Sequence, residues 1–328
     1  MKIKTSIWFA VLLAGATMEI NAADTFLDEK SAGPDFVVQG EYVGTITSPG
    51  GEKNKLAAQV IALGGGKFRA VFHGSGLPGD GWDRETKIEV NGETLDGKTV
   101  FTAEDKTDGT AEISGGAFTG KSEKHGTLKL EKVMRKSPTE GLKPPTGALI
   151  LLDGKNADAW EGGHLDERGL LAAGSKTKQQ TFQNYSLHVE FLLPFTPTGR
   201  GQDRANSGVY MQGRYEVQVL DSFGLKGLNN ECGGIYSQVA PAVNMCYPPL
   251  QWQTYDIEFQ AARFDGDGKK TKNAVISVKH NGVVIHENQE ITGPTGGGKK
   301  EDPSGGAIQL QGHGNPVFYR NAWLVEKK

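Results

Sequence analysis

One short segment of the chain combines two carboxylates, several amides and an arginine in a regular alternating pattern. Between Asn206 and Phe223 the sequence reads NSGVYMQGRYEVQVLDSF, in which apolar and polar residues alternate. A period of two predicts strands that bury one face and present polar side chains on the other. Planar carboxylate and amide groups on a rigid strand can form paired hydrogen bonds with neighbouring sugar hydroxyls. A merely solvated sheet face is the alternative interpretation.

This segment must be held by an all-β fold, because almost no helical periodicity occurs after the first residues. Residues 24–131 show short alternating runs and are predicted to form an accessory antiparallel β domain, either a meander, a roll or a small sandwich. Residues 132–145, KVMRKSPTEGLKPP, are charged and rich in proline and are predicted to be a linker. Residues 146–328 contain many strands at short spacing, which predicts a jelly-roll β-sandwich with a concave ligand-binding sheet.

Glycine-containing dipeptides predict where hairpins turn. Asn91-Gly92, Asp96-Gly97 and Asp108-Gly109 tolerate the positive φ angles of primed turns. The run FDGDGKKTKN, which begins at Phe264, has a superficial likeness to a calcium loop but lacks the glutamate at the twelfth position. A hairpin turn is therefore predicted there as well.

A weaker grouping in the first domain consists of His73, Trp82 and Asp83. In one interpretation these residues line a surface groove, but no catalytic constellation surrounds them, so a structural role is favoured. The glycines nearby do not form a phosphate loop, since no GK[ST] motif or helix follows them.

The first 23 residues predict export. Lys2 and Lys4 precede the apolar run 7–16, and the small residues Ala22 and Ala23 follow it, as in a secretory signal. The run is too short to span a membrane, which needs about 20 apolar residues, so a periplasmic or secreted protein without membrane insertion is expected. The formal net charge is −3 and no long basic run occurs, so nucleic acid is not an expected partner. An oligosaccharide or glycoside ligand is expected instead.

Two cysteines and a few histidines leave two questions open. Cys232 and Cys246 either form a loop-closing disulfide after export or remain buried thiols. His280 and His286 flank the hairpin dipeptide Asn281-Gly282, but two imidazoles without a third ligand are usually surface residues. The metal ligands stay unknown, and a bound divalent metal is left open.

Six sequence blocks within residues 147–326 resemble one family in their order and composition. The blocks are LLDGKNADAW, NSGVYMQGRYEVQVLDS, GGIYSQVAPAVNMCYPP, QWQTYDIEF, HNGVVIHEN and GAIQLQGHGNPVFYRNAWL. They resemble the 3-keto-disaccharide hydrolases, formerly described as a domain of unknown function in the concanavalin A-like lectin and glucanase superfamily. The resemblance implies a concanavalin-like jelly roll that acts on oxidised sugars. One departure is that this chain has Gln311, Gly312, His313 and Gly314 where the family usually has QDHG.

The related glycosidases carry the pattern ExDxxE, and this chain matches it only in part. The corresponding residues are Glu216, Gln218 and Asp221. Retaining hydrolysis needs two carboxyl groups about 5 Å apart with separated pKa values. Gln218 removes the middle carboxylate, and Asp221 reaches the same face only if a β-bulge intervenes. Ordinary displacement chemistry is therefore disfavoured.

The resemblance implies an easier reaction on a 3-keto-glycoside, in which one base removes the acidic hydrogen at C2 and the group at C1 is eliminated before water adds. Glu216 is the first candidate for the base and His313 is the second; Arg214, the Asn206 amide or a metal would stabilise the enolate. Glu190 and Glu258 are reserve acids or metal ligands. A non-catalytic, lectin-like glycan-binding protein is the alternative. The predicted substrate-binding residues are Asn206, Tyr210, Gln212, Arg214, Gln218, Asp221, Tyr236, Trp252 and Gln311.

Overall fold

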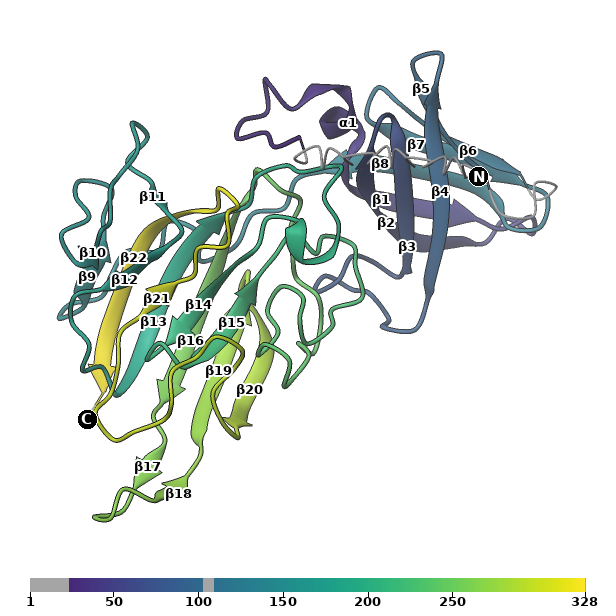
Figure 1. Ribbon diagram of the computed structural model, residues 1–328. Coiled ribbons are helices and arrows are strands. Elements are labelled where there is room, and N and C mark those ends of the chain that lie inside the picture. The colour runs from purple at the N-terminus through teal and green to yellow at the C-terminus, as the bar shows by residue number, and fades with distance from the viewer. Residues whose placement is uncertain (1–23, 103–108, 328) are drawn as a thin grey trace, which may run out of the picture.

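The computed structural model describes residues 24–102 and 109–327 and shows a β-barrel packed beside a two-sheet sandwich (Figure 1). The predicted all-β fold class is confirmed; one short helix, α1 (Gly33–Val38), precedes the barrel. The predicted secretory signal at residues 1–23 and the residue Asp108 lie outside the described residues. Within the described residues, no helix is long and apolar enough to cross a membrane.

The first domain is a closed barrel of eight antiparallel strands, each paired with its neighbours along the chain, and β8 closes it by pairing with β1. Alternating side chains fill its interior, among them Tyr42, Phe68, Phe101 and Phe118, all at most 2% exposed. The strands are β1 (Gly40–Thr47), β2 (Lys53–Gly64), β3 (Lys67–Gly74), β4 (Lys87–Leu95), β5 (Lys98–Thr102), β6 (Thr110–Ser114), β7 (Ala117–Ser122) and β8 (Gly126–Val133).

The hairpin predictions for this barrel had mixed outcomes. Asp96-Gly97 turns β4 into β5, with φ angles of 50° and 79°. The prediction for Asn91-Gly92 was wrong, because both residues lie inside β4, where Asn91 pairs with Arg69. A glycine is required there for a different reason: a Cβ at Gly92 would lie 2.6 Å from the Phe101 ring.

The second domain consists of two antiparallel sheets that enclose a common core. The smaller sheet has the order β10 (Trp160–Glu161), β12 (Ser175–Thr177), β21 (Gln309–Leu310), β14 (Ser207–Met211) and β15 (Tyr215–Val219). The larger sheet has the order β11 (Leu171–Ala172), β22 (Phe318–Lys327), β13 (Asn184–Leu192), β16 (Trp252–Gln260), β19 (Ala274–His280) and β20 (Val283–Ile291), with β9 (Leu149–Leu152) beside β22. The run after Phe264 forms a small hairpin of β17 (Arg263–Phe264) and β18 (Lys270–Lys272), as predicted.

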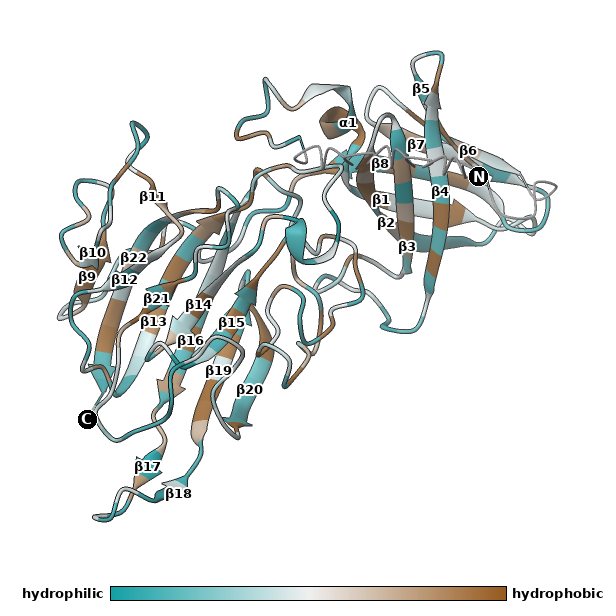
Figure 2. Ribbon diagram, viewed as in Figure 1, coloured by the Kyte–Doolittle hydropathy of each residue, from teal (hydrophilic) through white to brown (hydrophobic). Residues whose placement is uncertain are grey.

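Alternation along the strands decides which side chains enter this core. Val209, Met211, Val217 and Val219 of the smaller sheet are fully buried against apolar residues of the larger sheet. Figure 2 shows the alternation as teal and brown bands along the sandwich strands. Because successive residues point to opposite faces, the polar residues between these valines must lie on the outer face of the smaller sheet.

Barrel and sandwich share apolar contacts. Ile61 and Val71 of the barrel belong to the core cluster of the sandwich, and a Cβ at Gly224 would lie 2.7 Å from Ile61. Arg200 extends from the sandwich and donates to the Leu63 carbonyl of β2 at 2.7 Å. The two domains therefore pack directly against one another.

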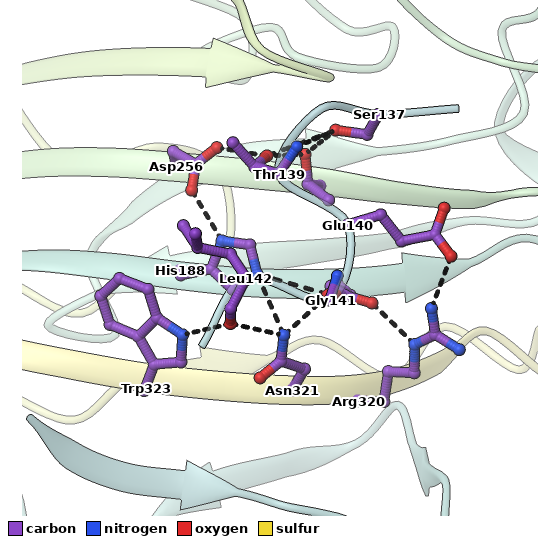
Figure 3. Close-up of polar contacts among 12 residues, drawn as sticks. Ser137, Thr139, Glu140, Gly141, Leu142, His188, Asp256, Arg320, Asn321 and Trp323 are labelled. Atoms are coloured by element: carbon purple, nitrogen blue, oxygen red, sulfur yellow. Dashed lines mark hydrogen bonds and ion pairs between the residues drawn. The ribbon is translucent and has the colours of Figure 1, made fainter. Parts of the chain in front are cut away.

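The segment predicted as a linker is also packed rather than free. Its first two residues, Lys132 and Val133, belong to β8, and residues 137–142 lie across the outer face of the larger sheet (Figure 3). Gly141 N–H donates to Glu190 at 2.5 Å, and Thr139 donates to Asp256 at 2.8 Å. Side chains of the sheet thus satisfy the polar groups of the linker.

The cysteines and the paired histidines are buried. Cys232 and Cys246 are separate thiols, so the structure does not contain the disulfide that the sequence allowed. The expectation that His280 and His286 are surface residues was wrong, because they are 0% and 4% exposed. His280 bonds to Gln253 and His286 to the Gly233 carbonyl, at 2.9 and 2.7 Å. Both imidazoles therefore serve packing in this sheet.

Candidate functional site

The candidate site is built on the hairpin of β14 and β15. The turn residues Gln212 and Gly213 have φ angles of 57° and 62°, the signs that a primed turn requires. The resulting register places Tyr210 opposite Glu216 and Gly208 opposite Gln218. These side chains share the outer face of the smaller sheet, because the core-facing residues alternate with them.

Glu216 is a buried carboxyl group whose hydrogen bonding is incomplete. Its side chain is 2% exposed, Oε2 lies 2.8 Å from the Tyr210 hydroxyl, and Oε1 has no partner among the described residues. Burial raises the pKa of Glu216 to about 7, although the hydrogen bond from Tyr210 acts in the opposite direction. Gly208 makes room for the carboxylate, since a Cβ there would overlap Oε1.

The Tyr210 hydroxyl links this carboxyl group to a covering segment. It lies 2.6 Å from the Gly296 carbonyl and accepts from the Gln311 amide at 3.2 Å. A hydroxyl has one hydrogen, so Tyr210 cannot donate to Glu216 and to Gly296 at once. When Glu216 is protonated, it can donate to Tyr210 and leave the tyrosine hydrogen for Gly296. The protonated state therefore satisfies the network best, in agreement with the raised pKa.

Three amides extend the polar face beyond Glu216. Gln202 in a short 3-10 helix (Gly201–Asp203) accepts from Gln218 at 3.0 Å and from Asn206 at 3.2 Å. Gln218 Oε1 and Asn206 Oδ1 are buried without a partner among the described residues. Because buried polar atoms in folded proteins are normally bonded, these two oxygens and Glu216 Oε1 point to a ligand.

His313 lies in an exposed turn at the edge of the same face. On its N-terminal side, Gln311 N–H donates to the Gly208 carbonyl at 2.8 Å. On its other side, Asn315 Oδ1 accepts from Asn206 N–H at 2.9 Å. The turn is thereby fixed to the start of β14, next to the side-chain amides of Gln202, Asn206 and Gln218.

The segment at residues 293–299 covers Glu216 and Tyr210. Thr295 accepts the Glu216 N–H at 2.9 Å, and Gly296 packs against the half-buried Tyr236 ring. Tyr236 N–H donates to the Glu216 carbonyl at 3.2 Å. The predicted ligand residue Tyr236 is thus a neighbour of Glu216, on the covering side.

Three other predicted substrate-binding residues are occupied by protein partners. Gln212 donates to the Phe182 carbonyl and accepts from Arg214. Arg214 also pairs with Asp302 at 2.7 Å and donates to the Lys300 carbonyl, so its charge is neutralised by Asp302 and not by Glu216. Asp221 forms a buried ion pair with Arg204 at 2.7 Å.

Trp252 and the reserve acids lie on the other sheet. Trp252 alternates with Thr254 and Asp256 along β16, and the Arg320 guanidinium sits 3.8 Å from its ring centroid. Glu190 bonds to the linker and to Arg320, and Glu258 pairs with Lys327. These residues occupy the outer face of the larger sheet, so the structure does not bring them together with Glu216.

Sequence reasoning missed Gln202 and Thr295 as parts of the site. Gln202 comes from a single turn of 3-10 helix and Thr295 from an irregular segment, and Thr295 is 79 residues from its partner Glu216. No local pattern distinguishes them. Gln309 pairs with Tyr210 across the sheet and alternates with the predicted residue Gln311 along the chain.

No ligand set for a metal emerges from the described part of the chain, since no group of three or more His, Cys, Asp and Glu side chains there could hold an ion. The divalent metal that the sequence left open is therefore not assigned to any residues.

The fold and the site define a class: a jelly-roll protein whose smaller sheet carries a buried carboxyl group among amides. The chain belongs to the family of 3-keto-alpha-glucoside-1,2-lyase-like domains, which it matches over residues 147–325. A candidate glycosyl hydrolase from Parabacteroides distasonis, known from a crystal structure, is similar at 34% identity and a TM-score of 0.52 over 56% of this chain and 85% of its own. A second such structure from the same organism is 16% identical, with a TM-score of 0.40 over 60% of this chain and 99% of its own. No curated protein matches the chain. Family membership gives the protein a glycan-acting role.

Proposed function

We propose that the protein cleaves 3-keto-glycosides by elimination at the glycosidic bond followed by hydration, with Glu216 as the base. One observation carries the proposal: a buried carboxyl group with a pKa of about 7 and an unpartnered oxygen lies beside the neutral groups of Tyr210 and Gln218. General bases work best when their pKa lies near the working pH. The match to a lyase-like family supports this reaction class.

The reaction needs one base and one donor. Glu216 removes the hydrogen at C2, and the electrons of that bond move onto the C3 carbonyl oxygen as an enolate. The enolate then reforms the ketone, a double bond forms between C1 and C2, and the group at C1 leaves and takes a proton. Water adds back, with its hydroxyl at C1 and its hydrogen at C2. The net change is hydrolysis, and no oxidant or reductant is required.

Amide groups are the proposed stabilisers of the enolate. Arg214 was a sequence-based candidate, but its guanidinium is engaged by Asp302, Gln212 and Lys300. Asn206 and Gln311 each use one amide hydrogen in the hydrogen bonds described above, which leaves the second for substrate. A preorganised donor at a developing oxyanion typically contributes about 3 kcal/mol.

Access to Glu216 requires that the segment at residues 293–299 move. The proposed trigger is ionisation of Glu216 itself, because the charged carboxylate takes the Tyr210 hydrogen and the bond to the Gly296 carbonyl is lost. The ionised state is thus both the competent base and the state with the loosest cover. Once the C2 proton is transferred, the bond from Tyr210 to Gly296 can form again.

The test is to incubate the purified mature chain with a 3-keto-glucoside beside its unoxidised parent and to follow aglycone release with and without a chelator. Release from the keto sugar alone is expected. Loss of activity with chelator would assign enolate stabilisation to a metal instead of an amide. A parallel His313→Gln variant tests the second candidate base. Glycan binding without release from either substrate would contradict the proposal and favour a lectin-like protein.

We further propose that this activity takes place after export to the periplasm or the outside of the cell. The support is the predicted signal at residues 1–23. Fractionation of cells that produce the full chain tests this, and a cytoplasmic, uncleaved protein would contradict it.

A further inference from the structure

A small pocket lies where the barrel meets the sandwich, away from the site on β14 and β15. Its volume is about 170 Å³, and its lining comes from both domains: His73, Trp82, Arg84 and Lys87 from the barrel, and Lys226 with residues 241–244 from the sandwich. Figure 1 shows the connection between β3 and β4 reaching toward the loops that precede β16. A ligand in this pocket would touch both domains.

A chain of hydrogen bonds fixes the chemical state of His73. Arg135 pairs with Glu41 at 2.6 Å, so this carboxylate is charged and only accepts. The Gln59 amide nitrogen must therefore face Glu41, at 3.0 Å, which turns the Gln59 oxygen toward His73 Nε2 at 3.2 Å. His73 Nε2 must donate, and burial beside Lys87 and Arg135 lowers the His73 pKa to about 4. The imidazole is thus neutral, with its lone pair on Nδ1.

His73 Nδ1 is a buried acceptor without a donor. The side chain is 2% exposed and lines the pocket, and no described residue bonds to Nδ1. Buried acceptors of this kind are uncommon because an unmade hydrogen bond costs about 1–3 kcal/mol. A ligand hydroxyl would supply the missing donor.

Positive charge dominates the rest of the lining. Arg84, Lys87 and Lys226 line the pocket, and none of the described residues that line it carries a carboxylate. Among the described residues, the only ion pair that these three cations form within 4 Å joins Lys87 to Glu89 at 3.9 Å. Burial lowers the pKa of Lys87; the charges of Glu89 and Glu231 act against this effect, and those of Lys226 and Arg69 add to it. An anion in the pocket would replace the water that burial removes from Lys87 and offset the repulsion from Lys226.

The indole of Trp82 supplies an apolar wall. Its Nε1 donates to the Thr86 carbonyl at 2.9 Å, and its ring meets the His73 ring edge-on at 4.9 Å between centroids. Apolar residues at 241–243 line the sandwich side. Aromatic and aliphatic walls suit the C–H groups of a sugar ring, as the cations suit a carboxylate.

We propose that this pocket binds an acidic sugar, with its carboxylate on the cations Arg84, Lys87 and Lys226, a hydroxyl on His73 Nδ1 and its ring against Trp82. The ligand class is a hydroxylated ring acid, such as a uronic acid at the end of a glycan chain. The site is separate from Glu216, and its occupation requires no turnover.

Isothermal titration calorimetry of the full mature chain at low salt tests the proposal with three probes: glucuronate, glucose and sulfate. Glucuronate is expected to bind with one site per chain and at least about 10-fold more tightly than glucose, the equivalent of one charge-assisted hydrogen bond. Sulfate is expected to bind more weakly than glucuronate, since it reaches neither His73 nor Trp82. Added salt should weaken the binding of glucuronate.

Matched variants locate the binding. The double variant Arg84→Met with Lys226→Met should weaken glucuronate binding about 100-fold, whereas Lys155→Met, which removes a charge that is 83% exposed elsewhere, should leave it unchanged. Thermal unfolding of each variant checks that it folds. Absence of glucuronate binding, retention of it in the double variant, or equal affinity for sulfate would each overturn the assignment to an acidic sugar. These readouts are independent of whether Glu216 acts as a base.

Discussion

The outer faces of the two sandwich sheets each contain a buried glutamate, but the hydrogen bonding of the two carboxylates differs. On the larger sheet, Glu190 is 0% exposed, and both of its oxygens are bonded, Oε2 to Arg320 and Oε1 to Asn321 and the Gly141 N–H. On the smaller sheet, Glu216 is almost as buried, yet Oε1 has no partner among the described residues. Burial and residue type are therefore the same, and only the partners differ.

The two carboxyl groups consequently shift in opposite directions. Burial raises both pKa values, but hydrogen bonds from His188, Asn321, Arg320 and Gly141 overcome it at Glu190 and lower its pKa to about 2. Glu216 has only Tyr210 to oppose burial, and its pKa rises to about 7. A completed network stabilises the charge and holds the linker, whereas an incomplete network leaves a base available for a ligand.

The histidine on the larger sheet illustrates the same difference. His188 Nδ1 lies 2.6 Å from Asp256 and its ring stacks on Trp323, in an arrangement of residue types that is common in catalytic sites (Figure 3). Its other nitrogen faces Glu190 and Asn321, at 3.5 and 3.4 Å. With both nitrogens occupied and the linker above it, His188 serves structure, and a site cannot be recognised from residue types alone.

The largest effect is expected from Glu216→Gln. If this carboxylate is the base and its ionisation loosens the cover, the variant should lose at least about 10²–10⁴ in kcat/KM on a 3-keto-glucoside. Steady-state release of the aglycone measures kcat/KM. Glu301→Gln is the matched control, because Glu301 also accepts from a tyrosine hydroxyl, that of Tyr215 at 2.6 Å, but Tyr215 packs in the core between the sheets and not on the outer face. An equal loss of activity in Glu216→Gln and Glu301→Gln would contradict a specific role of Glu216 as the base.

A large effect on stability, not on the reaction, is expected from Glu190→Gln. The change breaks a buried network and leaves Arg320 with Glu140 as its remaining carboxylate partner, so the free energy of unfolding at pH 7 should fall by about 3 kcal/mol. Urea unfolding measures this. Because the folded-state pKa of Glu190 is depressed to about 2, its contribution is present above the unfolded value of 4.5 and disappears as pH falls through 2. Glu258→Gln, at an exposed pair with Lys327, should cost at most about 1 kcal/mol.

The opposite sign is expected for the stability of Glu216→Gln. The pKa of Glu216 rises from 4.5 to about 7 on folding, so its favourable contribution is complete below pH 4.5 and is lost as pH rises through 7. At pH 8 the variant should be more stable than the wild type by up to about 3 kcal/mol, and at pH 4 the two should be equal. Urea unfolding at both pH values decides this, and a variant that is less stable at pH 8 would contradict the shift.

The smallest effect is expected from Tyr210→Phe. The hydroxyl stabilises the charged form of Glu216, so its removal should raise the pKa of Glu216 further. The acid limb of kcat/KM, which rises with pH as the base ionises, should move upward by about one pH unit. An acid limb that does not move in Tyr210→Phe would show that a group other than Glu216 controls the pH dependence of kcat/KM.

The hairpin of β14 and β15 could be predicted from sequence because it is a local feature. Strict alternation around Gly213 fixes which residues share a face, and this correctly grouped Tyr210, Glu216 and Gln218. The Asn91-Gly92 prediction failed because pairing of β4 with β3 and β5 overrides a dipeptide preference. Local rules therefore hold only where the surrounding strands agree with them.

Contacts between distant segments could not be predicted. Alternation shows that Trp252 and Glu190 lie on a polar face, but it does not show to which of the two sheets that face belongs. The cover over Glu216 comes from residues around Thr295, and the oxygen that bridges Asn206 and Gln218 comes from Gln202. The sequence thus indicated Glu216 as a candidate, whereas only the structure shows that one of its carboxylate oxygens has no partner among the described residues.

The most direct test of the central claim is to run the reaction of a 3-keto-glucoside in D₂O, with wild type and Glu216→Gln side by side, and to analyse the released 3-keto-sugar by mass spectrometry and NMR. Elimination followed by hydration predicts one deuterium at C2 in each product molecule, formed by the wild type and nearly absent from the variant, with a sample lacking enzyme as the control for spontaneous exchange. A released sugar that retains its C2 hydrogen would show direct displacement at C1 and would contradict the role assigned to Glu216.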